Sequence, residues 1–233
     1  MNSKLFRASL ATAITLTSLY ANAQVSVIHA GKLLVVPGNA PLEKQTIVIE
    51  NGRIKELRNG FVEASKIANG AKFIDLSEQF VMPGLMDMHV HMQGELGPNN
   101  ARDGIQLSDA DILIKSVNFA NKTLMAGFTT VRDLGSKAEQ SFALRDGIKK
   151  GLIPGPRIIA AGTSVAVTGG HGDVDGMRPD LLELSTAKTV CDGPFDCRRA
   201  TRRAIKFGAD VIKITSTGGV LSDTDTGTGQ QMA

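Results

Sequence analysis

Beyond Pro83 the sequence repeats one pattern, in which a short apolar stretch is followed by a loop and then by a helix-like stretch. The apolar stretches are expected to be strands at Leu85 to Val90, Thr129 to Arg132, Arg157 to Ala161 and Ala209 to Ile214. Strands that alternate with helices pair in parallel, because each helix returns the chain to the same end of the sheet. The expected fold class is therefore α/β.

Glycines mark the ends of the helices between these strands. Leu113, Val117, Ala120 and Leu124 follow one face of the first helix, and the second is expected from about Lys137 to Lys149. Asp196 is expected to cap the last helix. Each helix is followed by a glycine that can take the left-handed conformation, at Gly127, Gly151 and Gly208. Residues 83–233 thus suit the first half of an eight-stranded barrel, a fold of about 250 residues, whose outer strands would be unpaired edges unless another chain covers them.

Residues 24–82 have the signals of a small β domain. Its short strands are expected at Val25 to Val36, Thr46 to Glu50, Arg53 to Leu57 and Lys72 to Leu76. Asn51-Gly52 between the second and third strands predicts a hairpin, because both turn residues need a positive φ. His29 lies within a strand, and we expect it to be structural.

The first 23 residues have the pattern of a signal peptide. Lys4 and Arg7 precede an apolar stretch from Ala8 to Tyr20, and Ala21-Asn22-Ala23 forms a small-x-small cleavage pattern. The apolar stretch is shorter than the roughly 20 residues that span a bilayer. We therefore expect a mature chain that begins near Gln24, is periplasmic or secreted, and has no stable membrane span after cleavage.

The charge of the chain argues against a nucleic-acid partner. The sequence has 26 basic and 23 acidic residues, and two of the basic ones lie in the predicted signal peptide, so the mature net charge is about +1. One basic run has helical spacing without interleaved aromatic residues, which favours a solvated helix face: Arg198, Arg199, Arg202, Arg203 and Lys206. A small-molecule substrate is the expected partner, and a homo-oligomer stays open.

The stretch from Pro83 to His91 carries the strongest chemical signal. Side chains of a strand alternate between its faces, so Asp87, His89 and His91 are expected on one side, with apolar residues on the other. At the carboxyl end of a barrel strand, two such imidazoles would be adjacent ligands of a divalent metal. A bare His-x-His is weak evidence, but its place after Pro-Gly, where a β domain passes into βα units, makes the signal strong.

With these motifs the sequence resembles the amidohydrolase superfamily, in which His-x-His ends the first strand of a TIM-like (β/α)8 metallo-hydrolase barrel behind a small β-sandwich. The resemblance covers nearly the whole mature chain. It implies the N-terminal half of that barrel over residues 83–233 and the β-sandwich portion over residues 24–82. Val211 to Ser216 is similar to the fourth-strand segment whose lysine is carbamylated and bridges two metals, which makes Lys213 the third ligand residue beside His89 and His91.

Elementary chemistry agrees with that role for Lys213. A charged lysine between Ile212 and Ile214 in a buried strand costs several kcal/mol unless it is paired or loses its proton. Carbamylation of the neutral amine gives an anionic group whose two oxygens can each bind one ion of a metal pair. The alternative is a structural lysine paired with Asp87 or Asp133. Two zinc ions are the expected cofactor, and manganese, cobalt and iron are alternatives.

Three further segments are similar to the subgroup of Xaa-Pro dipeptidases and imidazolonepropionase-like proteins: Thr168 to Asp173, Cys191 to Pro194 and Thr217 to Val220. This similarity implies a small amide substrate, such as a dipeptide or an N-acyl amino acid. His171 follows the third strand and is a candidate substrate-binding residue, although a surface histidine in a glycine-rich turn is an equal alternative. The full pattern of a phosphate-binding P-loop is absent from the sequence.

Cys191 and Cys197 are the only cysteines of the sequence. Export into an oxidising compartment favours a disulfide between them over free thiols. A zinc site at this pair lacks the second pair or nearby histidine that a tetrahedral set needs.

The resemblance implies hydrolysis of a C–N bond by a metal-bridged hydroxide. The family's general acid, an aspartate after the eighth strand, and its later histidine ligands are expected beyond residue 233, so no catalytic acid is assigned within this sequence. The sequence is expected to be a piece of a longer protein, and a truncated product that is inactive alone is the alternative. Two other functions stay open, a mononuclear deaminase or cyclic-amide hydrolase of the same superfamily and a non-catalytic barrel protein.

Overall fold

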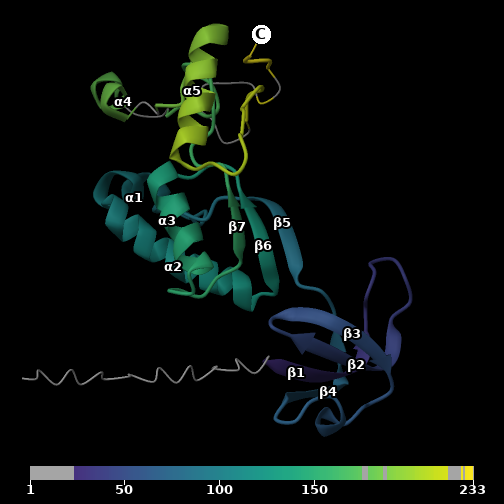
Figure 1. The fold of residues 1–233 in the computed structure, drawn as a ribbon. Coiled ribbons are helices and arrows are strands. Elements are labelled where there is room, and N and C mark those ends of the chain that lie inside the picture. The colour runs from purple at the N-terminus through teal and green to yellow at the C-terminus, as the bar shows by residue number, and fades with distance from the viewer. Residues whose placement is uncertain (1–23, 175–177, 186–187, 220–226, 228, 233) are drawn as a thin grey trace, which may run out of the picture. The chain divides into compact units, whose positions relative to one another are not determined.

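The computed structural model describes residues 24–174, 178–185, 188–219, 227 and 229–232 (Figure 1). The predicted signal peptide lies outside the described residues. The chain divides into two compact units, with the boundary between Pro83 and Gly84, and each is described by itself. Among the described residues, no helix has both the length and the apolar character that crossing a membrane requires.

The first unit is a four-stranded sheet with the strand order β3-β2-β1-β4. Its elements are β1 (Val25–Leu33), β2 (Leu42–Glu50), β3 (Arg53–Asn59), the 3-10 helix η1 (Ala64–Lys66) and β4 (Lys72–Val81). β1 pairs with β2 antiparallel and with β4 parallel. The predicted hairpin joins β2 to β3, and Asn51 and Gly52 both have a positive φ.

His29 has a structural role in this unit. Its Nε2 lies 2.9 Å from the carbonyl oxygen of Val62. Its ring stacks on Phe61, with centroids 4.8 Å apart, and is T-shaped to Phe73, with centroids 4.7 Å apart. The ring and one of its nitrogens are thus used for packing within the sheet unit.

The second unit is built on a parallel sheet with the order β5-β6-β7, covered by helices (Figure 1). Its elements are β5 (Leu85–Val90), α1 (Asn100–Gln106), α2 (Asp109–Met125), β6 (Phe128–Asp133), α3 (Ala138–Lys149), β7 (Arg157–Ala160), α4 (Pro179–Ser185) and α5 (Gly193–Phe207). Buried residues of the strands and of α2 and α3 form one core, among them Ala120, Val131, Leu144 and Ile158. The carboxyl ends of the three strands consequently lie at one edge of the sheet.

The prediction that Asp196 caps the last helix was wrong. Asp192 is the N-cap residue of α5, and a proline occupies the first turn, where the missing N–H of that residue costs nothing. The carboxylate of Asp196 instead lies within the first turn and accepts hydrogen bonds from the backbone N–H of Asp192 and from Arg199. The C-terminal prediction is confirmed, because Gly208 ends α5 in the left-handed conformation.

The predicted strand from Ala209 to Ile214 does not form a continuous ladder. Asp210 N–H donates to the carbonyl of Ala160, and farther along Ile214 forms an isolated parallel bridge with Val165. Between these contacts the neighbouring chain turns at Gly162, which has a φ of +69°. The segment therefore runs beside β7 in the predicted parallel direction, but the turn at Gly162 interrupts the hydrogen bonding.

Truncation of Leu144 should separate core packing from surface effects. The side chain is 1% exposed, so Leu144→Ala should lower the free energy of unfolding by about 2–5 kcal/mol. Ile114 on α2 is 70% exposed, and Ile114→Ala should change the free energy of unfolding by less than about 0.5 kcal/mol. Denaturant titration of both variants measures the difference, and equal losses would contradict the core assigned to the second unit.

Candidate functional site

A cavity of about 840 Å³ opens beside the carboxyl ends of β5, β6 and β7. Its wall includes the four residues singled out from the sequence, which are His89, His91, His171 and Lys213. Asp87, expected on the same side of the strand, is not part of this wall. Its carboxylate instead accepts a hydrogen bond of 2.9 Å from the backbone N–H of His89.

The two imidazoles of β5 and its following loop lie close together. The ring centroids of His89 and His91 are 5.3 Å apart, with an angle of 61° between the rings. Nδ1 of His91 lies 2.9 Å from the carbonyl oxygen of Gly135. A carbonyl only accepts, so this contact requires the proton on Nδ1, and in the neutral ring Nε2 then keeps the lone pair that can bind a cation.

Gly135 is required at its position beside His91. A Cβ atom there would lie 2.8 Å from Cε1 and 3.0 Å from Nδ1 of the imidazole. Any other residue would therefore push the ring or the turn away. The backbone of this turn and the ring of His91 are packed in direct contact.

Lys213 reaches the same cavity from the segment beside β7. The backbone of that segment is held by two hydrogen bonds, from Val165 N–H to the carbonyl of Lys213 at 2.8 Å and from Thr215 N–H to the carbonyl of Val165 at 3.0 Å. Within the described part of the chain Lys213 forms no ion pair. The proposed partner Asp133 is instead fully buried and bonded to the hydroxyls of Ser136 and Ser141.

The environment of His89 favours the neutral imidazole, which is the metal-binding form. Partial burial of the ring lowers the pKa of His89 most, and the positive charges of Lys213, His91 and Arg132 lower it further. The nearby carboxylate of Asp87 opposes this shift. Lys213 thus lies close enough for its positive charge to act on the imidazole of His89.

These residues fit part of a metal site. No group of three His, Cys, Asp or Glu side chains that could hold an ion occurs among the described residues. The site instead offers two neighbouring imidazoles and a lysine that has no anionic partner among the described residues. A carbamate on Lys213 would supply the missing anionic oxygens, so the donor set suits a divalent cation only after that modification.

The glycine-rich loop that carries His171 is fastened to the start of α5. Cys191 and Cys197 are joined in a disulfide, which closes the turn around Asp192. The carboxylate of Asp192 accepts hydrogen bonds from the backbone N–H and the hydroxyl of Thr168, at 3.2 and 2.7 Å. The disulfide thus fixes the turn around Asp192, and Asp192 fixes the loop of His171 through Thr168.

Gly219 lies directly against His171. A Cβ atom on Gly219 would come within 2.2–2.5 Å of three ring atoms. The backbone N–H of His171 donates to Oε1 of Gln231 at 2.9 Å. Segments far apart in the sequence therefore meet at this histidine, on the wall of the cavity.

The sequence matches the model of the amidohydrolase family over residues 80–230, which is more than half of the chain. The chain belongs to the amidohydrolase family. Its fold agrees, because solved amidohydrolase structures superpose on it over about half of their own length. The α/β fold class and the TIM-like barrel architecture predicted from the sequence are thereby confirmed.

Three amidohydrolase relatives are particularly informative. A Xaa-Pro dipeptidase with methionine bound in its active site is 36% identical, covers 90% of this chain and 51% of its own, and has a TM-score of 0.81. A prolidase complexed with N-methylphosphonate-L-proline is 31% identical, with coverages of 90% and 51% and a TM-score of 0.75. Ochratoxinase from Aspergillus niger is 28% identical over 87% of this chain and 44% of its own sequence. The chain thus spans about half the length of these relatives.

Two residues near His91 were missed from the sequence. Gly135 approaches the ring, and Gln93 contacts the same loop after β6. Gln93 continues the every-second-residue series of Asp87, His89 and His91, and this spacing was an available signal for it. For Gly135 the sequence offered only a glycine after a strand, which does not show what it would touch.

Replacement of Lys213 should raise the pKa of His89. A positive charge disfavours the imidazolium, so removing it in Lys213→Met lets His89 bind a proton at a higher pH. NMR titration of the metal-free protein in bicarbonate-free buffer measures this pKa. Lys188 lines the same cavity without contributing to the shift, so Lys188→Met is the matched control. An unchanged pKa in Lys213→Met would show that the two side chains do not face each other.

Proposed function

We propose that the protein containing this chain is an exported, metal-dependent hydrolase that cleaves the C–N bond of a small dipeptide-like amide. The observation that carries the proposal is the meeting of His89, His91 and Lys213 on one cavity wall, at the carboxyl ends of parallel strands. Active sites of barrel enzymes lie at that face, since the loops after the strands surround it. The amidohydrolase family of the chain supports the class of reaction.

Each of the three residues has a defined part in this function. Nε2 of His91 and the neutral ring of His89 would hold a divalent cation, and a carbamate on Lys213 would bridge to a second one. Bound cations of this kind lower the pKa of water and polarise a carbonyl group. His171, on the same wall, would contact the substrate, and no described residue is assigned to protonate the leaving amine.

The substrate class is supported by relatives and by the size of the cavity. The relatives include a Xaa-Pro dipeptidase, a prolidase and an ochratoxinase. A cavity of about 840 Å³ lies within the range usual for small-molecule sites. We therefore favour a dipeptide or an N-acyl amino acid over a polymeric substrate.

Export is proposed on two independent features. The first is the basic, apolar and small-residue pattern of residues 1–23. The second is the disulfide between Cys191 and Cys197, since such bonds persist in oxidising compartments. Mass spectrometry of the protein from its natural cells tests this proposal, because export predicts a mature N-terminus near Gln24.

Metal content and hydrolysis should depend on the three candidate ligands. In the natural protein, His89→Ala and His91→Ala should each lower metal occupancy and reduce hydrolysis of the best substrate in a panel of dipeptides and N-acyl amino acids by more than about 100-fold. Elemental analysis and a hydrolysis assay measure both quantities. Lys188→Ala, on the same cavity wall, should keep both near the parent values.

The role of Lys213 separates the binuclear from the mononuclear mechanism. Lys213→Ala should remove the second metal and most of the activity, and a short-chain carboxylic acid should partly restore it in place of the carbamate. A variant that keeps one metal and full activity would favour the mononuclear deaminase or cyclic-amide hydrolase. A parent protein that binds no metal and hydrolyses nothing in the panel would favour a non-catalytic barrel protein.

A further inference from the structure

Hydrogen bonds from Gln93 join the loop after β5 to the loop after β6. We infer that Gln93 is a positioning residue, which holds the turn of residues 133–137 so that the carbonyl of Gly135 fixes the ring of His91. The inference deepens the proposed function and rests on it for the role of His91 as a ligand. We call this set of contacts the Gln93 clamp, and it comprises Gln93, Asp133, Gly135, Ser136 and Lys137.

The side-chain amide of Gln93 binds the backbone of Lys137 at two points. Lys137 N–H donates to Oε1 of Gln93 at 2.6 Å, and Nε2 of Gln93 donates to the carbonyl of Lys137 at 3.1 Å. The amide thus forms hydrogen bonds with both the backbone N–H and the carbonyl of one residue. This complementarity fixes its orientation, because a flipped amide would place donor against donor and acceptor against acceptor.

The other end of the turn is held by a buried carboxylate. Asp133 is 0% exposed, and its two oxygens accept hydrogen bonds from Ser136 at 2.7 Å and Ser141 at 2.8 Å. Ser136 N–H also donates to the carbonyl of Gly162 at 3.2 Å. Gly135 therefore lies between two fixed points, one on each side along the chain.

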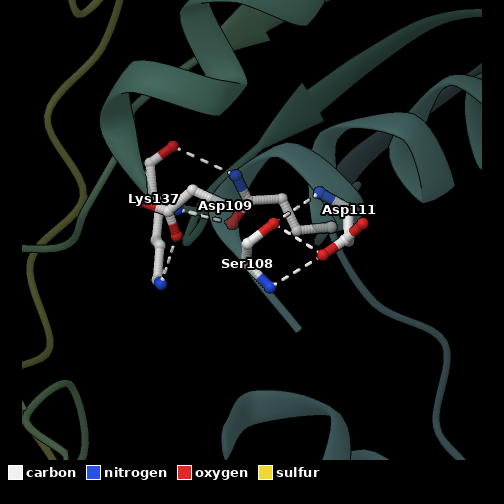
Figure 2. A network of polar contacts seen from close by, with 5 residues as sticks. Ser108, Asp109, Asp111 and Lys137 are labelled. Carbon is white, nitrogen blue, oxygen red and sulfur yellow. Dashed lines mark hydrogen bonds and ion pairs between the residues drawn. The ribbon is translucent and has the colours of Figure 1, made fainter. Parts of the chain in front are cut away.

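The side chain of Lys137 ties the clamp to the start of α2, as Figure 2 shows. Its Nζ lies 2.7 Å from Oδ1 of Asp109. Ser108 and Asp111 form a reciprocal capping box around the same helix start. The ion pair is largely exposed and contributes little stability, so the clamp depends on the contacts of Gln93 and Asp133 rather than on it.

This arrangement matters because the hydrogen bond to Gly135 sets both the tautomer and the orientation of His91. Ligating histidines usually donate their other ring N–H to a carbonyl or carboxylate, and loss of such partners lowers metal affinity by about 10–100-fold. Gln93 acts one step farther out, through Lys137 and the turn. A loosened turn would let the Gly135 carbonyl move away and leave the ring free to rotate.

Gln93→Leu tests the clamp, because it removes both amide contacts while keeping the side-chain size. Gln106→Leu is the matched control, since Gln106 is an exposed glutamine on α1 of the same unit and forms no hydrogen bond to the clamp among the described residues. Two quantities are measured in the natural protein. One is the proportion of the Nδ1–H tautomer of His91, obtained by ¹⁵N-histidine NMR without metal, and the other is Zn²⁺ affinity, obtained by chelator competition.

The expected result is a lower proportion of the Nδ1–H tautomer and a fall of about tenfold in Zn²⁺ affinity for Gln93→Leu, with both unchanged in Gln106→Leu. Gln93→Glu, which can still accept from Lys137 N–H, should lie between them, with thermal melting as the check on folding. An unchanged tautomer in Gln93→Leu would overturn the inference whatever the metal does. Gln93→Leu could change the tautomer while His91→Ala leaves Zn²⁺ binding intact. That result would overturn His91 as a ligand, and with it the proposed function. Gln93 would then position a residue that binds no metal.

Discussion

The parallel pairing of β6 with both β5 and β7 is the interaction on which the rest of the second unit depends. It places the loops after three strands at one edge, where side chains from distant parts of the sequence share a cavity wall. The same pairing brings the loop after β6 beside the loop after β5, so that the Gly135 carbonyl can meet the ring of His91. Without this register, His-x-His would be two imidazoles on an exposed strand, with nothing to orient them.

The βα pattern was predictable because each strand is a short apolar run that ends near glycine or a polar residue. Leu85 to Val90 has the predicted bounds, and β6 and β7 differ from the prediction only at their ends. The segment from Ala209 to Ile214 has the same apolar composition but forms no continuous ladder. Its neighbour turns at Gly162, and a pattern confined to one segment carries no information about where its partner bends.

The candidate site was predictable as far as it depends on residue type and spacing. His89, His91, His171 and Lys213 were named from the sequence, and they line one cavity. The residues that position these side chains were harder to predict, because the hydrogen bond between Gln93 and Lys137 joins residues 44 positions apart. Asp133 was considered as a partner of Lys213, yet two nearby serine hydroxyls satisfy its carboxylate. Competition between possible partners of one buried group is decided by three-dimensional distance, which spacing along the chain does not give.

The disulfide between Cys191 and Cys197 encloses only a short turn, and this locality has a consequence for how the chain would respond to its surroundings. Reduction would leave the pairing of β5, β6 and β7 untouched, whereas Cys191 belongs to a separate small cluster with Val165 and Ala200. Reduction would also release the turn around Asp192 and so weaken the hydrogen bond between its carboxylate and Thr168. Protein with reduced cysteines would therefore keep the parallel sheet and differ from the disulfide-bonded form around the start of α5 and in the loop that carries His171.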